Sequence, residues 1–482
     1  EVLNNIKQKN IYQSVFYIII VFLFLLFYFP ASTYSLWHDE VLTVSKFASN
    51  GVKGVFFAPY EANNHVLYSI ILAFLLDIFP FSEVIVRLPA MIFAVCFFVV
   101  LFYYAQKYFG AFIGWSVGLV ILFDDNIVEL CLQARGYTIL FLCTVVTLFT
   151  CFEWIKRKRK KSMIIFMLFS LIGIWTWMLF AVFVGCLLLY SLCVAEKKEK
   201  IKVIILGMIL VILSVVPYLP MLKSMYEYYS KNLSLFGDKL SWDTFFMYNL
   251  VNCLDGLGIK ETNYWGGFIA LILCGYGIFS LYKKKKDILN IMCCGYFGFS
   301  CMLMIFQINA GARYFFFLDF FVLIFLFYGL QNLWNIDGKA QIGKIVATTC
   351  FIMLSVILFA PQNLEIKTSR REYPLEAFKE SVEYISKNLD NRKLIICSLR
   401  KEGFEFYLGR EGIDNYSIIV EEDPEKILQY LQMENKAENL LVVDHAILRD
   451  AIFSEEQPAA FYNRQLTRGK IIVYEFEKGE LL

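Results

Sequence analysis

The stretch "IYQSVFYIIIVFLFLLFYFPASTYSLWHDE" (11–40) decides the fold class of this chain. Residues 11–30 are almost wholly apolar and long enough for a transmembrane helix. They are too long and bulky for the core of a signal peptide, and no small-residue cleavage site follows, so we predict a retained span. Directly after it stand His38, Asp39 and Glu40, although a helix that leaves a membrane needs no carboxylates. These acids are either a solvated flank or part of a reaction centre.

The composition extends this interpretation to most of the chain. Of 482 residues, 59% are hydrophobic and 18% aromatic, and the mean hydropathy is +0.58. A soluble protein cannot bury so much apolar surface, so we predict a polytopic membrane protein embedded in a lipid bilayer. The net charge of +2 argues against a nucleic-acid partner. Most of the 13 cysteines lie inside apolar runs, which indicates neither a disulfide framework nor a metal-ligand pattern.

Basic loops predict which end of the bundle faces the cytoplasm. The clearest are "KRKRKK" (156–161), "EKKEKIK" (196–202) and "KKKK" (283–286). The apolar runs that we expect to cross the membrane are 11–30, 85–105, 111–123, 137–154, a hairpin of two spans over 163–194, 203–220, 264–282, 288–307, 314–333 and 345–361.

One further run, "HVLYSIILAFLLDIFP" (65–80), must not cross. If it crossed, the loop 156–161 would lie outside, against the positive-inside rule. The run is short, contains Asp77 and ends in Pro80, so we predict that it lies in the interface or dips in and returns. This leaves about eleven spans, with the N-terminus cytoplasmic and a long first external loop over 31–84.

After Pro361 the composition changes to that of a soluble domain. Residues 375–389 have the pattern of an amphipathic helix, and 424–433 and 455–466 also favour helices. Strands are indicated at 393–398, 416–420, 440–444 and 470–476. We therefore predict two parts: a transmembrane catalytic domain over 1–361 and a small extracytoplasmic α/β domain over 362–482.

The predicted topology gathers ionisable residues at the external boundary of the membrane. Such residues at membrane depth cost several kcal/mol unless they are paired or hydrated. Their convergence predicts a shared polar cavity. The residues are Asp39, Glu40, His65, Glu83, Arg87, Asp124, Asp125, Glu129, Arg135 and Arg313.

Three segments together resemble a known family. They are "WHDE" (37–40), the run from "NNHVLYS" to "AQKYFG" with its "RLPA" (63–110), and "LQARGYTILFL" (132–142). The chain resembles bacterial relatives of protein O-mannosyltransferases and lipid A aminoarabinose transferases, glycosyltransferase family 39, with the GT-C fold. The resemblance covers residues 11 to about 200, and "ARYFFFLDFF" (312–321) adds a later match.

The resemblance implies an inverting transferase that takes a sugar from a polyprenyl-phosphate donor on the external face. It implies that Asp39 is the general base, because an acceptor hydroxyl must lose a proton as it attacks the anomeric carbon. Glu40 would orient the acceptor or tune its neighbour. The acceptor stays open between a protein, a wall polymer and a glycolipid.

The departing lipid phosphate gains negative charge, which arginines stabilise through paired hydrogen bonds. Arg135, Arg313 and Arg87 are the candidates, and Tyr137 and Tyr314 would pack beside these cations. For Arg87 the alternative is an anchor at the end of a helix, and for Arg135 and Arg313 it is a snorkelling residue at the membrane interface.

His65 occupies the place of the histidine in the family's His-Pro-Pro pattern, but Val66 and Leu67 replace the prolines, so its role as a phosphate or sugar donor competes with that of an interfacial histidine. Asn64 is a candidate for binding sugar hydroxyls, with ordinary turn chemistry as the alternative.

Asp124 and Asp125 follow the span at 111–123 and are candidates for substrate binding. We expect no cofactor. A divalent cation held by these two acids with Glu129 is the alternative, and it is less favoured than a structural or substrate role.

A flippase or other polytopic transporter is the alternative function, because polar residues inside a bundle also mark transport paths. Transport sites lie near the bilayer midplane between related halves, whereas these residues gather at one boundary and the chain shows no internal symmetry.

Overall fold

The structure is a computed structural model of the 482-residue chain. It describes residues 14–15, 17–26, 28–61, 64–122, 124–231, 264–305, 315–334, 377–388, 393–398, 400–420, 439–443, 462–468 and 471–476.

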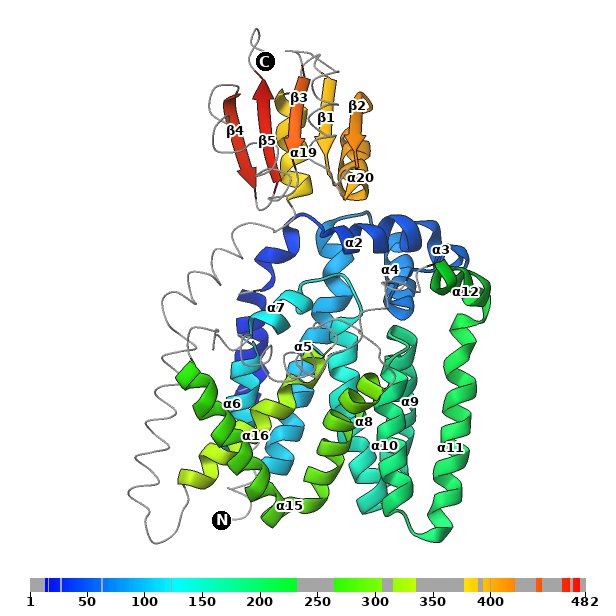
Figure 1. The fold of residues 1–482 in the computed structure, drawn as a ribbon, viewed down its shortest axis with the longest axis vertical. Helices are drawn as coiled ribbons and strands as arrows, with labels where there is room; N and C mark the ends of the chain where they lie inside the picture. The colour runs from blue at the N-terminus through cyan, green and yellow to red at the C-terminus, as the bar shows by residue number, and fades with distance from the viewer. Residues whose placement is uncertain are drawn as a thin grey trace.

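A bundle of apolar helices forms the body of the protein (Figure 1). Residues 17–26 are helical where 11–30 is predicted to span. The bundle continues with α5 (Glu83–Phe109), α6 (Ala111–Leu122), α7 (Asp125–Cys131), α8 (Tyr137–Arg157), α9 (Lys160–Thr176), α10 (Phe180–Val194), α11 (Lys197–Val215), α15 (Tyr264–Ile305) and α16 (Asp319–Trp334). The chain is a multi-pass membrane protein, and the predicted hairpin over 163–194 is confirmed as α9 and α10.

The helix α15 is two spans joined at a bend. Lys285 departs from helical geometry, with φ −145° and ψ 46°, in the middle of the lysine run 283–286. The two parts correspond to the predicted spans 264–282 and 288–307. The last predicted span, 345–361, lies outside the described residues, so the count of eleven stays a prediction.

The first part of α15 crosses α16 with almost no space between the backbones. A Cβ atom added at Gly277 would lie 1.9 Å from the carbonyl oxygen of Phe325, and one at Gly329 would lie 2.1 Å from that of Leu273. Only glycine permits so close a crossing, which is the way that small residues bring membrane helices together.

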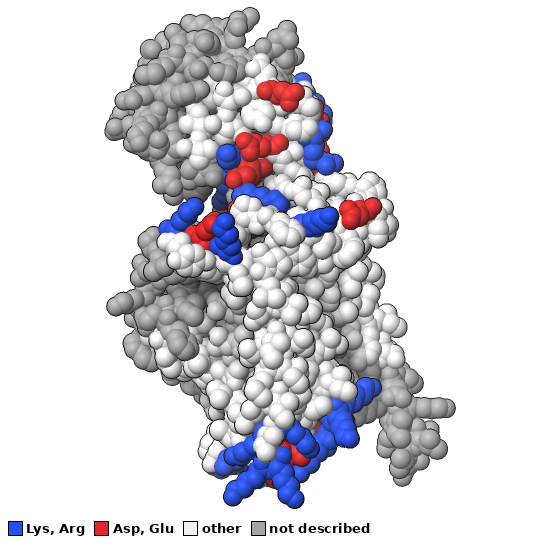
Figure 2. All heavy atoms as spheres, turned by 90° about the vertical axis from the view of Figure 1, so that its right-hand side faces the viewer, with Lys and Arg blue, Asp and Glu red and all other residues white. Residues whose placement is uncertain are grey.

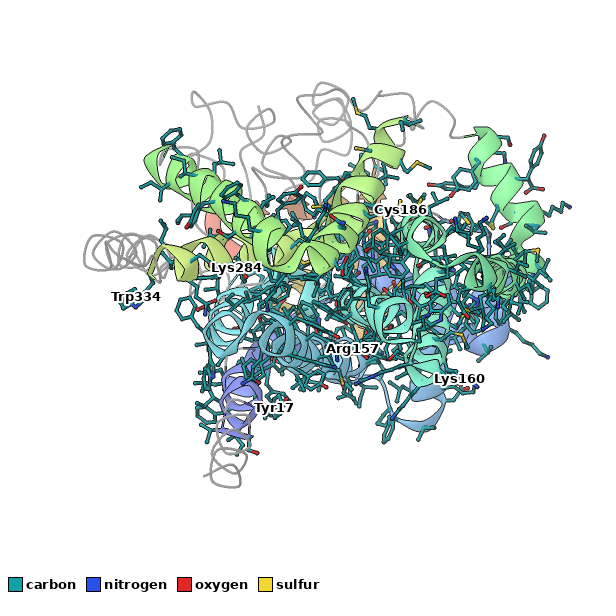
Figure 3. All side chains as sticks on the ribbon, turned by 90° about the horizontal axis from the view of Figure 1, so that it is seen from below. Tyr17, Arg157, Lys160, Cys186, Lys284 and Trp334 are labelled. Atoms are coloured by element: carbon teal, nitrogen blue, oxygen red, sulfur yellow. The ribbon has the colours of Figure 1, made fainter. Side chains whose placement is uncertain are left out.

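The basic loops meet at one end of the bundle. Lys156 pairs with Asp287 at 2.7 Å, and Lys158 pairs with Glu196 at 2.7 Å, so these pairs connect all three loops. Figure 2 shows lysine and arginine gathered at the lower end, and Figure 3 labels Arg157, Lys160 and Lys284 there. We call this the basic end. The pattern is the one that the positive-inside rule predicts.

The first loop folds as a series of short helices at the opposite end. They are η1 (Pro30–Thr33), α2 (His38–Leu42), η2 (Thr43–Phe47), η3 (Ala48–Asn50), α3 (Gly51–Phe57) and α4 (Val66–Ile78). The turn η4 (Val216–Met221) and α12 (Leu222–Lys231) cover this loop from the side of α11. One of the contacts is a 2.6 Å hydrogen bond from the Tyr60 amide to the Ser224 hydroxyl.

The run 65–80 does not cross the bundle, as predicted. His65, at the start of α4, lies 5.1 Å from the ring of Tyr137, which begins α8. Phe81, just beyond the end of α4, lies under Arg410 of the C-terminal domain at 3.9 Å. Both ends of α4 are therefore at the end of the bundle opposite the basic loops.

The C-terminal domain contains a five-stranded sheet in the order β2-β1-β3-β5-β4. Its elements are α19 (Phe378–Asn388), β1 (Lys393–Cys397), α20 (Lys401–Glu411), β2 (Tyr416–Ile419), β3 (Asn439–Val443), β4 (Tyr462–Arg468) and β5 (Ile471–Phe476). The strand β1 runs parallel to β2 and β3, whereas β5 runs antiparallel to β3 and β4. In Figure 1 the domain stands above the first loop, and α20 contacts α2.

The sequence predicted most of this domain but not all of it. The predicted helix over 455–466 is wrong where the structure describes it, because β4 forms a hairpin with β5 and the ladder supplies its backbone hydrogen bonds. The helix α20 was not predicted. The predicted helix 424–433 and the predicted domain boundary at 361 lie outside the described residues.

Candidate active site

The buried ion pair of Glu40 and Arg87 organises the start of the first loop. The Glu40 side chain is fully buried and that of Arg87 is 2% exposed. Arg87 Nη2 lies 2.6 Å from Glu40 Oε2, and Nε lies 3.0 Å from Oε1. Glu40 Oε2 also accepts the Trp37 amide at 2.8 Å, which closes the first turn of α2.

Arg87 also holds the backbone that leads into α2. Nη1 donates to the carbonyl oxygens of Ala31, Ser32 and Tyr34, and Nη2 donates to that of Ser35. Together with Glu40, these acceptors occupy all five N–H groups of the guanidinium. In the described structure all its donors are used within the protein, where they hold the start of the first loop, so the phosphate role of Arg87 stays a prediction.

The Glu40 carboxylate is buried among protein donors, and its predicted role toward the acceptor stays a prediction. The Ala134 amide also donates to Glu40 Oε1, which ties α2 to the segment before α8. This segment carries Arg135, which pairs with Asp39. The Glu40–Arg87 pair therefore helps to position Arg135.

Asp39 forms the second acid–arginine pair, with Arg135. Arg135 Nη1 lies 2.6 Å from Asp39 Oδ2, and the arginine side chain is fully buried, whereas that of Asp39 is 29% exposed. The same Nη1 donates to the Tyr137 hydroxyl at 2.9 Å, and the guanidinium lies 5.1 Å from the Tyr137 ring centre. The structure thus brings together three of the predicted site residues, with only the acid facing solvent.

Gly136 allows His65 to approach this pair. A Cβ atom at position 136 would lie 2.2 Å from Thr176 Cγ2 and 2.9 Å from His65 Nδ1. His65 is 3% exposed, and its ring meets the Tyr137 ring edge-on at 5.1 Å. The histidine is therefore buried against the tyrosine that accepts from Arg135.

Ionisable residues from two domains pair with each other next to α2. His38 Nε2 lies 4.0 Å from Glu402 of α20, and Lys46 lies 2.7 Å from Glu61 and 3.9 Å from Glu402. Burial lowers the pKa of His38 below its ordinary value, against the opposing effect of the nearby Glu402 carboxylate. His38 is thus held in its neutral form at neutral pH.

The other predicted residues have different positions. Asn64 is 8% exposed and its Oδ1 accepts the Ser69 hydroxyl at 2.9 Å. Asp124 is 1% exposed and its Oδ1 accepts the Ile127 amide at 3.1 Å, which caps the start of α7. Asp125 is the first residue of α7, and Arg313 lies outside the described residues.

The predicted substrate roles of Asn64, Asp124 and Asp125 stay predictions. Within the described ranges, no group of three or more histidine, cysteine, aspartate or glutamate side chains is placed to hold a metal ion.

The sequence did not identify the residues of the C-terminal domain that contact the first loop. Tyr407 and Glu380 both hydrogen-bond to backbone amides just before α2. Neither residue lies in a motif, and each is more than 340 positions from its partner in the chain (separations of 371 and 345). Only the amphipathic pattern of 375–389 indicated that a helix in this region packs against another part of the protein.

Comparisons with known proteins agree with the GT-C fold. A family model described as dolichyl-phosphate-mannose-protein mannosyltransferase matches residues 64–221. Among curated protein sequences, none matches. The structure is similar to that of ArnT from Cupriavidus metallidurans bound to undecaprenyl phosphate, with a TM-score of 0.57 and 11% identity over 96% of this chain and 97% of that one.

The same protein in the apo state gives a TM-score of 0.56. The archaeal oligosaccharyltransferase AglB from Archaeoglobus fulgidus, in complex with an inhibitory peptide and a dolichol-phosphate, gives 0.50 at 9% identity, over 90% of this chain and 70% of that one. The predicted fold class, a GT-C membrane fold, is confirmed at the level of these similarities.

Proposed function

We propose that this protein is a membrane glycosyltransferase that moves a sugar from a polyprenyl-phosphate donor to an acceptor hydroxyl. The observation that carries the proposal is the Asp39–Arg135 pair, in which a partly exposed carboxylate stands 2.6 Å from a buried cation. The GT-C fold supports the proposal, as does the match of residues 64–221 to a mannosyltransferase family model. The ArnT structure that this chain resembles holds undecaprenyl phosphate, a donor carrier of the proposed kind.

In the proposed reaction Asp39 is the general base. The acceptor hydroxyl gives its proton to the Asp39 carboxylate as its oxygen bonds to the anomeric carbon. The bond from that carbon to the phosphate oxygen breaks, and its electron pair leaves with the polyprenyl phosphate. Attack and departure occur on opposite faces of the sugar, so the configuration inverts.

Arg135 supplies the positive charge for the departing phosphate. Its guanidinium is buried, where a fixed cation stabilises developing negative charge more strongly than it does in water. A phosphate at this position also competes with Asp39 for Nη1, which loosens the ion pair and leaves the carboxylate more basic. Tyr137, the first residue of α8, accepts from the guanidinium, and His65 packs against the Tyr137 ring. Arg313 is the second proposed phosphate ligand.

The proposed orientation places this site outside the cytoplasm. The helix α8 begins at Tyr137 beside the site and ends at Arg157 in the basic end. Its 21 residues rise about 30 Å, the thickness of a hydrocarbon core. Since basic loops face the cytoplasm, the donor enters from the bilayer with its phosphate at the external face, and the acceptor arrives from solvent.

Transfer of a radiolabelled sugar from a polyprenyl-phosphate donor in detergent tests this proposal. Changing Asp39→Asn keeps the size and a hydrogen-bond acceptor but removes the base, so transfer should fall by about 10² to 10⁴-fold. The control is Glu61→Gln, an acid of the same loop that pairs with Lys46 at 2.7 Å. Full activity of Asp39→Asn, or equal loss in the control, would contradict the assignment.

The same wild-type and variant proteins also test the alternative that the protein is a transporter. Reconstituted in vesicles, a flippase would move the lipid-linked sugar between leaflets without forming a glycosylated product. Lipid movement without transfer, unaffected by Asp39→Asn, would replace the proposed function by transport.

A further inference from the structure

The C-terminal domain completes the backbone hydrogen bonds of the segment that carries Asp39. The amides of Ser35, Leu36 and Trp37 lie in succession just before α2. Trp37 donates to Glu40 at 2.8 Å, within the first loop itself. The other two amides donate to the C-terminal domain: Ser35 to Glu380 Oε1 at 3.2 Å and Leu36 to the Tyr407 hydroxyl at 2.9 Å.

Tyr407 is buried at the junction between the two domains. Its side chain is 4% exposed, and its hydroxyl both accepts the Leu36 amide and donates to Glu83 Oε1 at 3.4 Å. Burial raises the pKa of this tyrosine above its ordinary value, so the hydroxyl stays protonated and able to donate. Glu83 begins α5, the helix that also carries Arg87, so one hydroxyl joins α20, the first loop and α5.

Further contacts hold α19 and α20 against the same segment. The Lys379 amide donates to the Ser35 hydroxyl at 3.2 Å, and the Lys379 ammonium lies 3.2 Å from Glu83 Oε2. Arg410 covers the Phe81 ring at 3.9 Å, and Phe406 packs edge-on against that ring at 5.4 Å. These contacts lie at Ser35, Phe81 and Glu83, so the domain is held both before α2, which carries Glu40, and at the start of α5, which carries Arg87.

These contacts have a consequence for Asp39. Arg87 holds the carbonyl oxygens of Tyr34 and Ser35, while the C-terminal domain holds the amides of residues 35 and 36. Asp39 is in the first turn of α2, which begins at His38. The direction in which α2 starts, and with it the position of the Asp39 carboxylate, depends on both sets of bonds.

We propose that the C-terminal domain is part of the catalytic unit, and that Tyr407 is a positioning residue that holds the start of α2 so that Asp39 meets the acceptor. Tyr407 acts through the Leu36 amide and contacts no reacting atom. The catalytic half of this inference rests on the proposed glycosyl transfer, whereas the positioning half concerns the chain alone.

Hydrogen exchange of the full-length protein in detergent tests the positioning half. In Tyr407→Phe the ring stays but the Leu36 amide loses its acceptor, so peptides covering 31–42 should exchange about fivefold faster. Tyr416→Phe is the matched control, because this tyrosine lies in β2 of the same domain. Unchanged exchange in Tyr407→Phe, or equal acceleration in the control, would overturn the proposal.

Should Tyr407→Phe fail to accumulate, Glu380→Ala provides the same test at the Ser35 amide. This change removes the acceptor at 3.2 Å and leaves the Tyr407 contact intact. Faster exchange over 31–42 with an unchanged thermal midpoint supports the proposal, and unchanged exchange overturns it.

Initial rates of sugar transfer test the catalytic half. A displaced base slows the chemical step without affecting donor binding, so kcat of Tyr407→Phe should fall about tenfold while the donor KM stays within about twofold. An unchanged kcat alongside faster exchange would show that the domain holds the loop without any catalytic consequence. Absence of transfer in the wild-type protein would defeat the proposed function instead, and the exchange result would still decide the positioning role.

Discussion

Two acid–arginine pairs stand next to each other at the start of the first loop, and they differ in how much solvent they meet. Both have an N–O distance of 2.6 Å. In the Glu40–Arg87 pair the side chains are 0% and 2% exposed, and further protein groups occupy every donor of the arginine. In the Asp39–Arg135 pair the arginine is buried but the carboxylate is 29% exposed. Adjacent residues of identical charge therefore have different environments.

The difference shows how a buried ion pair can fix the backbone around a neighbouring, exposed one. Removing both charges of Glu40–Arg87 from water is costly, and only the surrounding donors and carbonyl oxygens make it tolerable. In return the pair fixes the backbone on both sides: residues 31–35 through Arg87 and the Ala134 amide through Glu40. The Asp39–Arg135 pair lies next to these same two segments, so the same contacts restrict its motion.

The largest expected effect follows from breaking the buried pair. Arg87→Met leaves the Glu40 carboxylate buried without its cation, which should cost about 3 to 5 kcal/mol of unfolding free energy. We expect a much lower yield of folded protein and a lower thermal midpoint in detergent. Adding Glu40→Met should recover part of the loss, since no charge then stays buried. Wild-type stability of the single variant would refute the structural role.

At the Asp39–Arg135 pair we expect a smaller loss of stability than in Arg87→Met and a larger loss of sugar-transfer activity. Arg135→Lys keeps the charge but loses the planar fork, so transfer should fall by about 10²-fold. Stability should change by less than in Arg87→Met, because the Asp39 carboxylate keeps contact with water. Parallel measurement of initial rates and thermal midpoints checks this separation. Equal losses of stability in the two arginine variants would remove the distinction between the pairs.

The packing around Gly136 allows a third prediction, about how tightly the segment before α8 is held. Gly136→Ala places a methyl group 2.2 Å from Thr176 Cγ2, and the overpacking should cost about 1 to 3 kcal/mol of unfolding free energy and displace Tyr137. The control is Gly185→Ala in α10, where a Cβ meets nothing within 4 Å. Thermal unfolding of both variants should show a loss only at position 136. A loss at neither position would show that the segment before α8 adapts freely.

The smallest expected effect is a pH dependence at His38. Burial lowers its folded pKa below the ordinary value of about 6.5. As pH falls through about 6.5, the unfolded chain therefore binds a proton that the folded chain does not, and stability decreases. Thermal midpoints measured across this range should fall for the wild type and fall less for His38→Asn. If the thermal midpoint fell more steeply with falling pH in His38→Asn than in the wild type, the His38 pKa would be shifted in the opposite direction.

The sequence was informative wherever local pattern or charge bias determines structure. Apolar runs predicted the described spans, and the basic loops showed that 65–80 does not cross. The same topology placed Asp39 and Arg135 at one end of the bundle, where the structure joins them at 2.6 Å. Both inferences depend on the energy of placing charge in a membrane, which is large and leaves few alternatives.

Features that depend on tertiary partners were not predictable in this way. Nothing near Arg87 in sequence distinguishes a guanidinium that collects four backbone carbonyls from one that is open to phosphate. The segment 462–468 became a strand because β5 was available to pair with it. Tyr407 acquired its role only because α20 rests on α2, a contact between residues several hundred positions apart.

That long-range contact also bears on how the protein is made. Leu36 follows the apolar helix at 17–26, whereas its acceptor on α20 is 371 positions later. During biogenesis the Leu36 amide therefore gains its acceptor only after the domain that carries α20 has been synthesised and has folded. A chain that ends before α20 would have its membrane helices but would lack the acceptor of the Leu36 amide, so the order of the loop around Asp39 is set late in synthesis.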